Sequence, residues 1–192
     1  MMEKQGVPAV VCFNKTDLAK EKELSVLMDV YKDCGHRVIF TSVSGETGLS
    51  EIREAVDHKT TVLAGPSGVG KSSMLNLLYL DANMETGAVS EKIQRGKHTT
   101  RHSELIRVGE DTFVMDTPGF SSLFVDMFEE DEIKYYFKEF EPYEGQCRFQ
   151  GCSHTHEPGC GVKQALDEGK ISKTRYDNYV LIYNELKEKR KW

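Results

Sequence analysis

Residues 65–72, with the sequence GPSGVGKS, have a spacing typical of phosphate binding. They match G-x-x-x-x-G-K-[ST] and lie between an apolar segment and an amphipathic one, as this motif requires. Glycines let the backbone approach a phosphate closely, and successive N–H groups then face the anion. We therefore predict that Lys71 contacts the β- and γ-phosphates of a nucleotide and that Ser72 binds Mg²⁺. The alternative is a glycine-rich turn that precedes an ordinary helix and binds no phosphate. The predicted nucleotide contacts of this loop are Gly65, Ser67, Gly68, Val69, Gly70, Lys71, Ser72 and Ser73.

Residues 116–119, DTPG, end another apolar segment. We expect Asp116 in the Mg²⁺ shell and expect the Gly119 amide to contact the γ-phosphate and to move when that group leaves. Alone, D-x-P-G is a common turn. The functional interpretation therefore depends on the strand before it and on the loop at 65–72.

Residues 14–17, NKTD, have the residue types that select guanine among the bases. Guanine presents two adjacent N–H donors and one carboxylate accepts both, so Asp17 is the predicted selecting group. Adenine lacks this pair of donors, and an acceptor left unpaired beside it gives strong discrimination. We expect Asn14 to tie this turn to the phosphate loop and Lys15 to lay its aliphatic stem over the base.

Residues 41–48, TSVSGETG, follow the next apolar segment, where the backbone of Ser42 and Val43 is expected to contact the base oxygen. Taken alone, NKTD and TSVS are weak patterns that also occur in surface turns. Four loops that each follow a predicted strand favour one common site, because the carboxyl ends of parallel strands meet at one edge of a sheet.

Three cysteines and a histidine form the pattern C-x4-C-x-H-x5-C between residues 147 and 160. Three thiolates and an imidazole suit a closed tetrahedral zinc site, which is structural because protein ligands fill the whole shell. A segment poor in aliphatic residues also needs such a crosslink. His156 competes with the histidine of this pattern, and free thiols in a loop are the alternative to a metal. The predicted ligands are Cys147, Cys152, His154 and Cys160.

The pattern of the segments between these loops predicts an α/β fold. Apolar segments typical of buried strands alternate with segments of helical spacing, which favours a mostly parallel sheet with helices on both faces. The expected strands are 7–14, 37–42 and 60–65, and the expected helices are 19–34, 48–57 and 70–80. Later segments are typical of a hairpin (103–108 with 112–116), a helical stretch (129–141) and two helices within 162–190. We expect two domains, a nucleotide-binding one at 1–125 and a helical zinc-binding one at 126–192.

The composition is that of a soluble globular protein, with 39% hydrophobic and 29% charged residues among 192. No stretch approaches the roughly 20 apolar residues that a membrane helix needs, and the N-terminus lacks the pattern of a signal peptide. We therefore expect a cytoplasmic protein, in which clustered cysteines indicate metal rather than disulfides, and we expect a monomer. The net charge of −6 argues against a broad electrostatic grip on nucleic acid.

The order of these motifs is circularly permuted relative to Ras-like GTPases, since the base-selecting turn precedes the phosphate loop. Together with the Cys/His cluster it resembles the ribosome small-subunit-dependent GTPase family (RsgA, also called YjeQ) over roughly residues 7–185. The strings that carry the resemblance are NKTDL, TSVSGETGL, GPSGVGKSS, GKHTT, DTPGF and CRFQGCSHTHEPGC. The resemblance implies a circularly permuted P-loop GTPase domain followed by a small zinc domain, using GTP or GDP, Mg²⁺ and one structural Zn²⁺. It also favours His154 over His156 as the ligand.

The resemblance further implies that the protein acts in late maturation of the small ribosomal subunit. The subunit is expected to stimulate GTP hydrolysis, and the subunit and its rRNA are the expected partners of the protein. One alternative is a GTP- or GDP-dependent rRNA or ribosome-binding module with negligible turnover, and a weaker one is an ATPase. The family also carries an N-terminal OB-fold and a strand and helix ahead of residue 7. This sequence has neither, so we expect a truncated form.

In Ras-like proteins, the glutamine that follows the D-x-x-G glycine orients the attacking water. Here Phe120 occupies that position, and because a phenyl ring cannot form a hydrogen bond with water, another residue must orient it. The resemblance supports His98 as the catalytic candidate, and an exposed histidine in a basic loop is the alternative. Thr100, or failing that Thr99, is the expected switch threonine that completes the Mg²⁺ shell. Residues 92–107 hold five basic side chains and one acidic one, which predicts contact with rRNA phosphates or, alternatively, a solvated loop.

Overall fold

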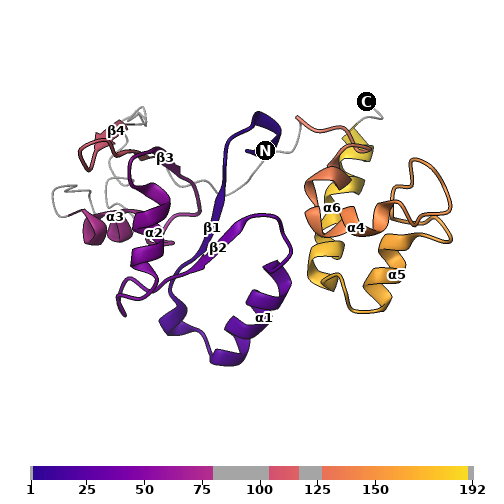
Figure 1. The fold of residues 1–192 in the computed structure, drawn as a ribbon, viewed down its shortest axis with the longest axis horizontal. Helices are drawn as coiled ribbons and strands as arrows, with labels where there is room; N and C mark the ends of the chain where they lie inside the picture. The colour runs from indigo at the N-terminus through magenta and orange to yellow at the C-terminus, as the bar shows by residue number, and fades with distance from the viewer. Residues whose placement is uncertain (1, 80–103, 117–126, 190–192) are drawn as a thin grey trace, which may run out of the picture. The chain divides into compact units, whose positions relative to one another are not determined.

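The computed structural model describes residues 2–79, 104–116 and 127–189 (Figure 1). Contacts divide the chain into two compact units, which we call the strand-rich unit and the helical unit. The strand-rich unit comprises Val10–Lys20 and Ile39–Leu123, and the helical unit comprises Met1–Ala9, Glu21–Val38 and Phe124–Trp192. Residues 21–38 thus group with the C-terminal residues, and the domain boundary expected after residue 125 stays a prediction.

Five strands lie in the described residues and form two sheets. The larger has the order β3-β5-β4, in which β3 (Thr60–Leu63) is parallel to β5 (Phe113–Asp116) and β4 (Glu104–Arg107) is antiparallel to it. The smaller pairs β1 (Val10–Phe13) with β2 (Arg37–Phe40). The predicted alternation of strands and helices and the hairpin before residue 116 are confirmed, whereas these strands form two sheets rather than one continuous sheet.

Two helices supply the core of the strand-rich unit. In α2 (Leu49–Val56) the residues Ile52 and Val56, one turn apart, are buried. The other helix, α3 (Lys71–Leu78), buries Met74, Leu75 and Leu78. It lies against α2, as Figure 1 shows. These side chains pack with Ile39 and Val114 in one cluster, and burying each contributes about 1.5–3 kcal/mol. The cluster fixes the start of α3, where the phosphate loop ends.

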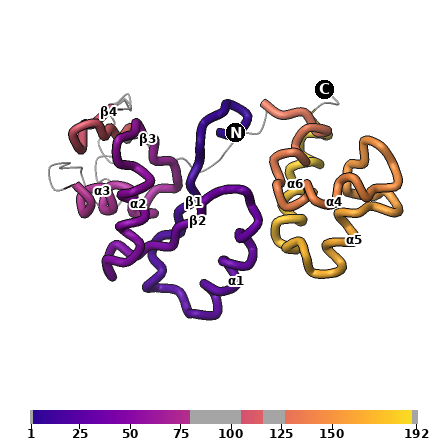
Figure 2. Tube along the Cα trace, viewed as in Figure 1, coloured from indigo at the N-terminus to yellow at the C-terminus, as the bar shows by residue number. Residues whose placement is uncertain are grey.

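The helical unit is built around aromatic side chains. Its elements are η1 (Glu3–Gln5), α1 (Glu21–Tyr31), η4 (Ile133–Tyr136), η5 (Lys138–Phe140), α4 (Glu141–Glu144), α5 (Gly161–Asp167) and α6 (Lys173–Lys189) (Figure 2). The rings of Phe140 and Tyr179 have no exposed surface and meet edge to face with centroids 5.0 Å apart. The stretch expected to be helical at 129–141 forms two short 3₁₀ turns, because the backbone of Phe137 (φ −105°, ψ 82°) leaves the helical region between them. No helix in the described part of the chain is long and apolar enough to span a membrane.

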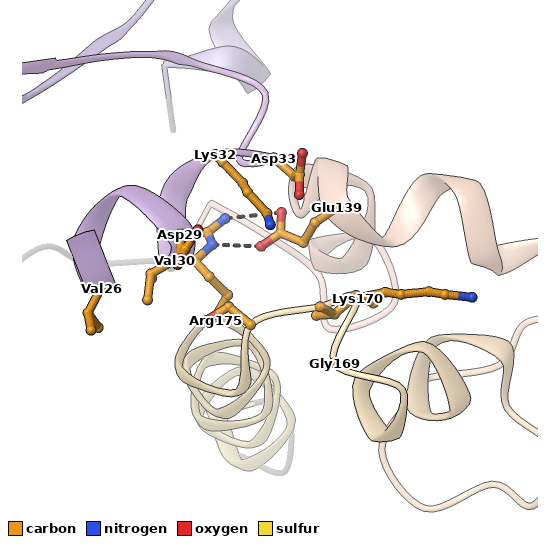
Figure 3. Close-up of a pocket in the computed structure, with 11 residues that line it drawn as sticks. Val26, Asp29, Val30, Lys32, Asp33, Glu139, Gly169, Lys170 and Arg175 are labelled. Atoms are coloured by element: carbon orange, nitrogen blue, oxygen red, sulfur yellow. Dashed lines mark hydrogen bonds and ion pairs between the residues drawn. The ribbon is translucent and has the colours of Figure 1, made fainter.

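An ion pair ties α6 to its neighbours in this unit. Arg175 Nε lies 2.6 Å from Glu139 Oε1, and its guanidinium lies 4.8 Å from the Phe137 ring and 5.5 Å from the Tyr31 ring of α1. Figure 3 shows the pair at the edge of a hollow of about 340 Å³ beside Lys32. Because the Glu139 side chain is only 6% exposed, each charge needs the other to remain buried.

Candidate nucleotide site and metal centre

The phosphate loop holds its lysine in place through its own carbonyls. Lys71, the first residue of α3, donates from Nζ to the carbonyl oxygens of Gly65 at 2.8 Å and Pro66 at 3.0 Å. Gly68 and Gly70 have φ angles of +75° and +99°, which favour glycine. An ammonium group therefore lies inside a glycine-rich loop at the N-terminus of a helix, an arrangement suited to a phosphate anion.

The base-selecting turn is joined to this loop by direct hydrogen bonds. Asn14 Nδ2 donates to the Val69 carbonyl at 2.8 Å, which is the link between turn and loop that the sequence predicts. Thr41 Oγ1 donates to Asn14 Oδ1 at 3.1 Å, and Thr16 donates to the Thr41 carbonyl from both its N–H and its hydroxyl. Lys15 takes the left-handed conformation at φ +68°. Three loops far apart in the sequence thus meet at Asn14.

The Asp17 carboxylate is held in one orientation by a buried serine. Ser42, 2% exposed, donates from Oγ to Asp17 Oδ1 at 2.5 Å and accepts from the Gly45 N–H at 2.9 Å. The hydrogen bonds from Ser42 and then Ser44 lower the pKa of Asp17. Asp17 is itself exposed, so an ionised acceptor faces the space where a base would lie. Sequence reasoning considered only the Ser42 backbone and missed this role of its hydroxyl.

The close approach of Asn14 to Gly70 makes a testable prediction. A Cβ added at Gly70 would lie 2.4 Å from Asn14 Nδ2, whereas one added at Gly68 would meet nothing within 4 Å. Both positions have positive φ, so alanine at either should cost about 1–2 kcal/mol of backbone strain. We expect Gly70→Ala to lose about 1–3 kcal/mol more than Gly68→Ala in urea unfolding, because the added Cβ would push the Asn14 amide away from its hydrogen bonds with Val69 and Thr41. Equal losses in the two variants would show that the contact with Asn14 is not tight.

Four further residues of the predicted nucleotide site lie in the described part of the strand-rich unit. The backbone of Asp116, at the end of β5, pairs with Leu63 at the end of β3, two residues before the phosphate loop. Ser72 and Ser73 lie in the first turn of α3, and Val43 packs against the core of the strand-rich unit. Three predicted residues lie outside the described part of the chain, namely His98, Thr100 and Gly119.

The four predicted metal ligands lie together in the helical unit. The ligand atoms of Cys147, Cys152, His154 and Cys160 are all within 4.8 Å of one another. His154 Nδ1 lies 3.6 Å from Cys147 Sγ and 3.4 Å from Cys160 Sγ, and those two sulfurs are 4.0 Å apart. Tetrahedral zinc, with bonds of about 2.0 Å to nitrogen and 2.3 Å to sulfur, separates its ligand atoms by roughly 3.5–3.8 Å. The cluster is close to this geometry and is therefore compatible with a zinc ion.

Backbone and side-chain groups around the cluster orient the ligands. The N–H groups of His154, Gly161 and Lys163 each donate to a cysteine sulfur at 3.4 Å. His154 Nε2 lies 3.2 Å from Glu144 Oε1, which leaves Nδ1 for the metal. His156 lies outside the cluster, with its Nδ1 2.9 Å from Thr155 Oγ1.

Burial favours the neutral forms of Cys152 and His154. Burial raises the pKa of Cys152 to about 12 and lowers the pKa of His154. Because zinc binds thiolates, metal uptake at neutral pH must release the proton of the Cys152 thiol. His154 also has a positive φ of 57°, a strained backbone that persists when the surrounding structure holds it. Sequence reasoning missed Glu144, which no local pattern connects to His154.

A family model and individual relatives both relate this chain to the RsgA GTPase family. The model of the RsgA GTPase family matches residues 1–126. A relative named small ribosomal subunit biogenesis GTPase RsgA, from Agathobacter rectalis, is 55% identical over 192 residues, which are 100% of this chain and 64% of the relative. A relative of the same name from Clostridium kluyveri is 49% identical over 191 residues, covering 99% of this chain and 66% of its own length.

Two solved structures are similar along nearly the whole chain. YjeQ from Thermotoga maritima has a TM-score of 0.78 and 36% identity, covering 96% of this chain and 62% of that one. YloQ, described as a circularly permuted GTPase, has a TM-score of 0.70 and 35% identity, covering 94% of this chain and 57% of that one. The circular permutation inferred from the order of the motifs is thus shared with a solved structure.

Proposed function

Because this chain belongs to the RsgA GTPase family, we propose that it binds GTP and hydrolyses it to GDP as a factor in late maturation of the small ribosomal subunit. The chain spans 64% of the length of the Agathobacter rectalis relative, so the activity of the longer relatives is proposed for it rather than carried over. The observation that supports the proposal most is the hydrogen bond from Asn14 to Val69, 2.8 Å long, which joins base-selecting turn and phosphate loop into one site.

The residues of the predicted nucleotide site divide between the base, the phosphates and Mg²⁺. Asp17 accepts the two N–H groups of guanine, Lys15 covers the base with its stem, and the backbone at Ser42 and Val43 meets the base oxygen. The N–H groups of Gly65 and of residues 67–70 and the Lys71 ammonium hold the phosphates, since Pro66 has no N–H to donate. Ser72, Asp116 and Thr100 form the Mg²⁺ site, and Mg²⁺, when bound, neutralises charge that develops on the β- and γ-phosphates.

Hydrolysis needs a group that orients water, and we propose His98 for this role because Phe120 cannot supply it. The Gly119 amide holds the γ-phosphate while the water attacks. An oriented general base or hydrogen-bond acceptor contributes about 10²–10⁴-fold to such a step.

The role of His98 makes a second testable prediction. We expect His98→Ala to lower kcat for GTP hydrolysis by about 10²–10⁴-fold with an unchanged Kd for GTP, measured by phosphate release in a single turnover. His102→Ala, in the same basic segment, is the control and should retain the rate. Unchanged kcat in His98→Ala would exclude the histidine as the catalytic group.

The metal cluster, in this proposal, holds one structural zinc ion. Four protein ligands fill a tetrahedral shell and leave no position for a reacting water. The proposal also includes a domain division at residue 125, a cytoplasmic location and a monomeric state. It further includes contact of the basic segment 92–107 with rRNA phosphates.

The proposal is tested by GTP turnover with and without purified small ribosomal subunits. We expect slow hydrolysis by the chain alone and a clear acceleration by the subunit. Nucleotide binding without acceleration would favour the alternative, a GTP- or GDP-dependent rRNA or ribosome-binding module with negligible turnover.

A further inference from the structure

A hollow beside the metal centre is lined in part by the metal-site residues Cys147, Cys152, His154 and Glu144 and in part by side chains that have no role assigned above. Its volume is about 370 Å³, within the range of small-ligand sites. The segment 147–152, which begins and ends with a metal ligand, lines the hollow together with Lys134, Tyr135 and Glu144. The cluster therefore fixes part of the lining of the hollow, which favours binding because little order has to be gained on association.

Two large aromatic side chains of this hollow are exposed. Tyr135 is 56% exposed and Phe149 is 45% exposed, whereas Phe140 and Tyr179 of the same unit are fully buried. Both exposed rings line the one hollow. Exposed rings grouped in a concave surface are typical of binding sites, because they offer large contact area at low entropic cost.

Each of the two rings carries a cation. The Arg148 guanidinium lies 5.4 Å from the centre of the Phe149 ring, and Lys134 Nζ lies 5.1 Å from the centre of the Tyr135 ring. Among the described residues that line the hollow, Glu144 has the one carboxylate, which lies 3.2 Å from His154 Nε2 and 3.9 Å from Lys134 Nζ. Lys134 also donates to the Cys152 carbonyl at 3.1 Å, so Arg148 is the exposed charge at this surface.

We propose that this hollow binds an unpaired base of a single-stranded RNA. The inference rests on the proposed function, since a factor that acts on a ribosomal subunit meets RNA with unpaired bases. Unpaired bases stack on aromatic rings and on guanidinium planes, and a cation at the rim contacts the adjacent phosphate. A duplex keeps its bases stacked inside and cannot offer one to the hollow. A basic peptide would meet Arg148 as a like charge.

The test measures the anisotropy of a labelled, non-self-complementary RNA of about ten nucleotides. We expect Phe149→Ala and Tyr135→Ala each to weaken binding about 5- to 150-fold, the range for loss of one base–aromatic stack. Phe149→Trp should retain binding because it keeps a stacking face. Leu181→Ala, at a position of α6 that is 66% exposed, is the matched surface control and should bind as the unchanged protein does.

Three results would overturn the hollow as an RNA site: unchanged affinity in both alanine variants, equal affinity for a duplex of the same sequence, or no RNA binding at all. If the variants lose affinity for intact small subunits but not for the RNA, the hollow takes a protein instead. GTP affinity, measured in parallel, separates the two proposals. RNA binding without GTP binding overturns the proposed function alone, and GTP binding without RNA binding overturns the hollow alone.

Discussion

Replacing Asp17 by asparagine should lower the affinity for GTP by about 10³- to 10⁵-fold and should raise the affinity for xanthosine triphosphate. A carboxylate accepts both N–H groups of guanine, whereas an amide offers one acceptor and places an NH₂ group against the second donor. Xanthine has an oxygen where guanine has its amino group, so it pairs with the amide. Competition with a fluorescent GTP analogue measures both affinities.

The position of Asp17 makes this substitution informative. Ser42 Oγ donates to Asp17 Oδ1 at 2.5 Å, and the asparagine retains a carbonyl oxygen that accepts the same bond. The turn should therefore keep its shape, and xanthosine triphosphate binding by the variant is the internal control for folding. A variant that binds GTP as well as the unchanged protein would refute the assignment of Asp17.

Loss of one metal ligand should have the largest effect on the helical unit. We expect Cys152→Ser to lose the zinc ion and the fixed packing of the aromatic core. Structural zinc contributes an apparent 10–16 kcal/mol or so at pH 7, comparable to the whole stability of a domain. The hydroxyls of Tyr176 and Tyr179 donate to the carbonyls of His154 and Ser153, so α6 is bonded directly to the metal-binding segment.

Zinc content and near-ultraviolet circular dichroism measure this loss. His156→Ala is the matched control, because His156 lies outside the cluster and should leave one zinc ion per chain. Treatment of the unchanged protein with a strong chelator should reproduce the spectrum of Cys152→Ser. Full zinc content and an unchanged spectrum in Cys152→Ser would contradict a four-ligand site.

Features set by short spacings could be predicted from the sequence. The phosphate loop, the hairpin that ends at Asp116 and the Cys/His cluster each depend on residues within a few positions of one another. The choice of His154 over His156 was left open by the pattern itself, because both lie between Cys152 and Cys160. The fold separates them, since only His154 brings a ring nitrogen within 3.4 Å of Cys160 Sγ.

Features set by packing between distant segments could be predicted only where a known motif implies them, as for the link from Asn14 to the phosphate loop. The Thr41 hydroxyl that orients Asn14 is 27 positions away from it, and Glu144 precedes His154 by 10. No periodicity connects such residues, because the contact exists only after strands and turns have assembled. The grouping of α1 with the C-terminal residues has the same origin, since Arg175 of α6 packs on Tyr31.

In the proposed function, the loops around Asn14 form a guanine nucleotide site. Its most direct test is the competition of GTP and ATP for the unchanged protein in the presence of Mg²⁺. We predict that GTP binds at least about 10²-fold more tightly than ATP, because adenine leaves the Asp17 carboxylate unpaired. Equal affinities for the two nucleotides would contradict the claim.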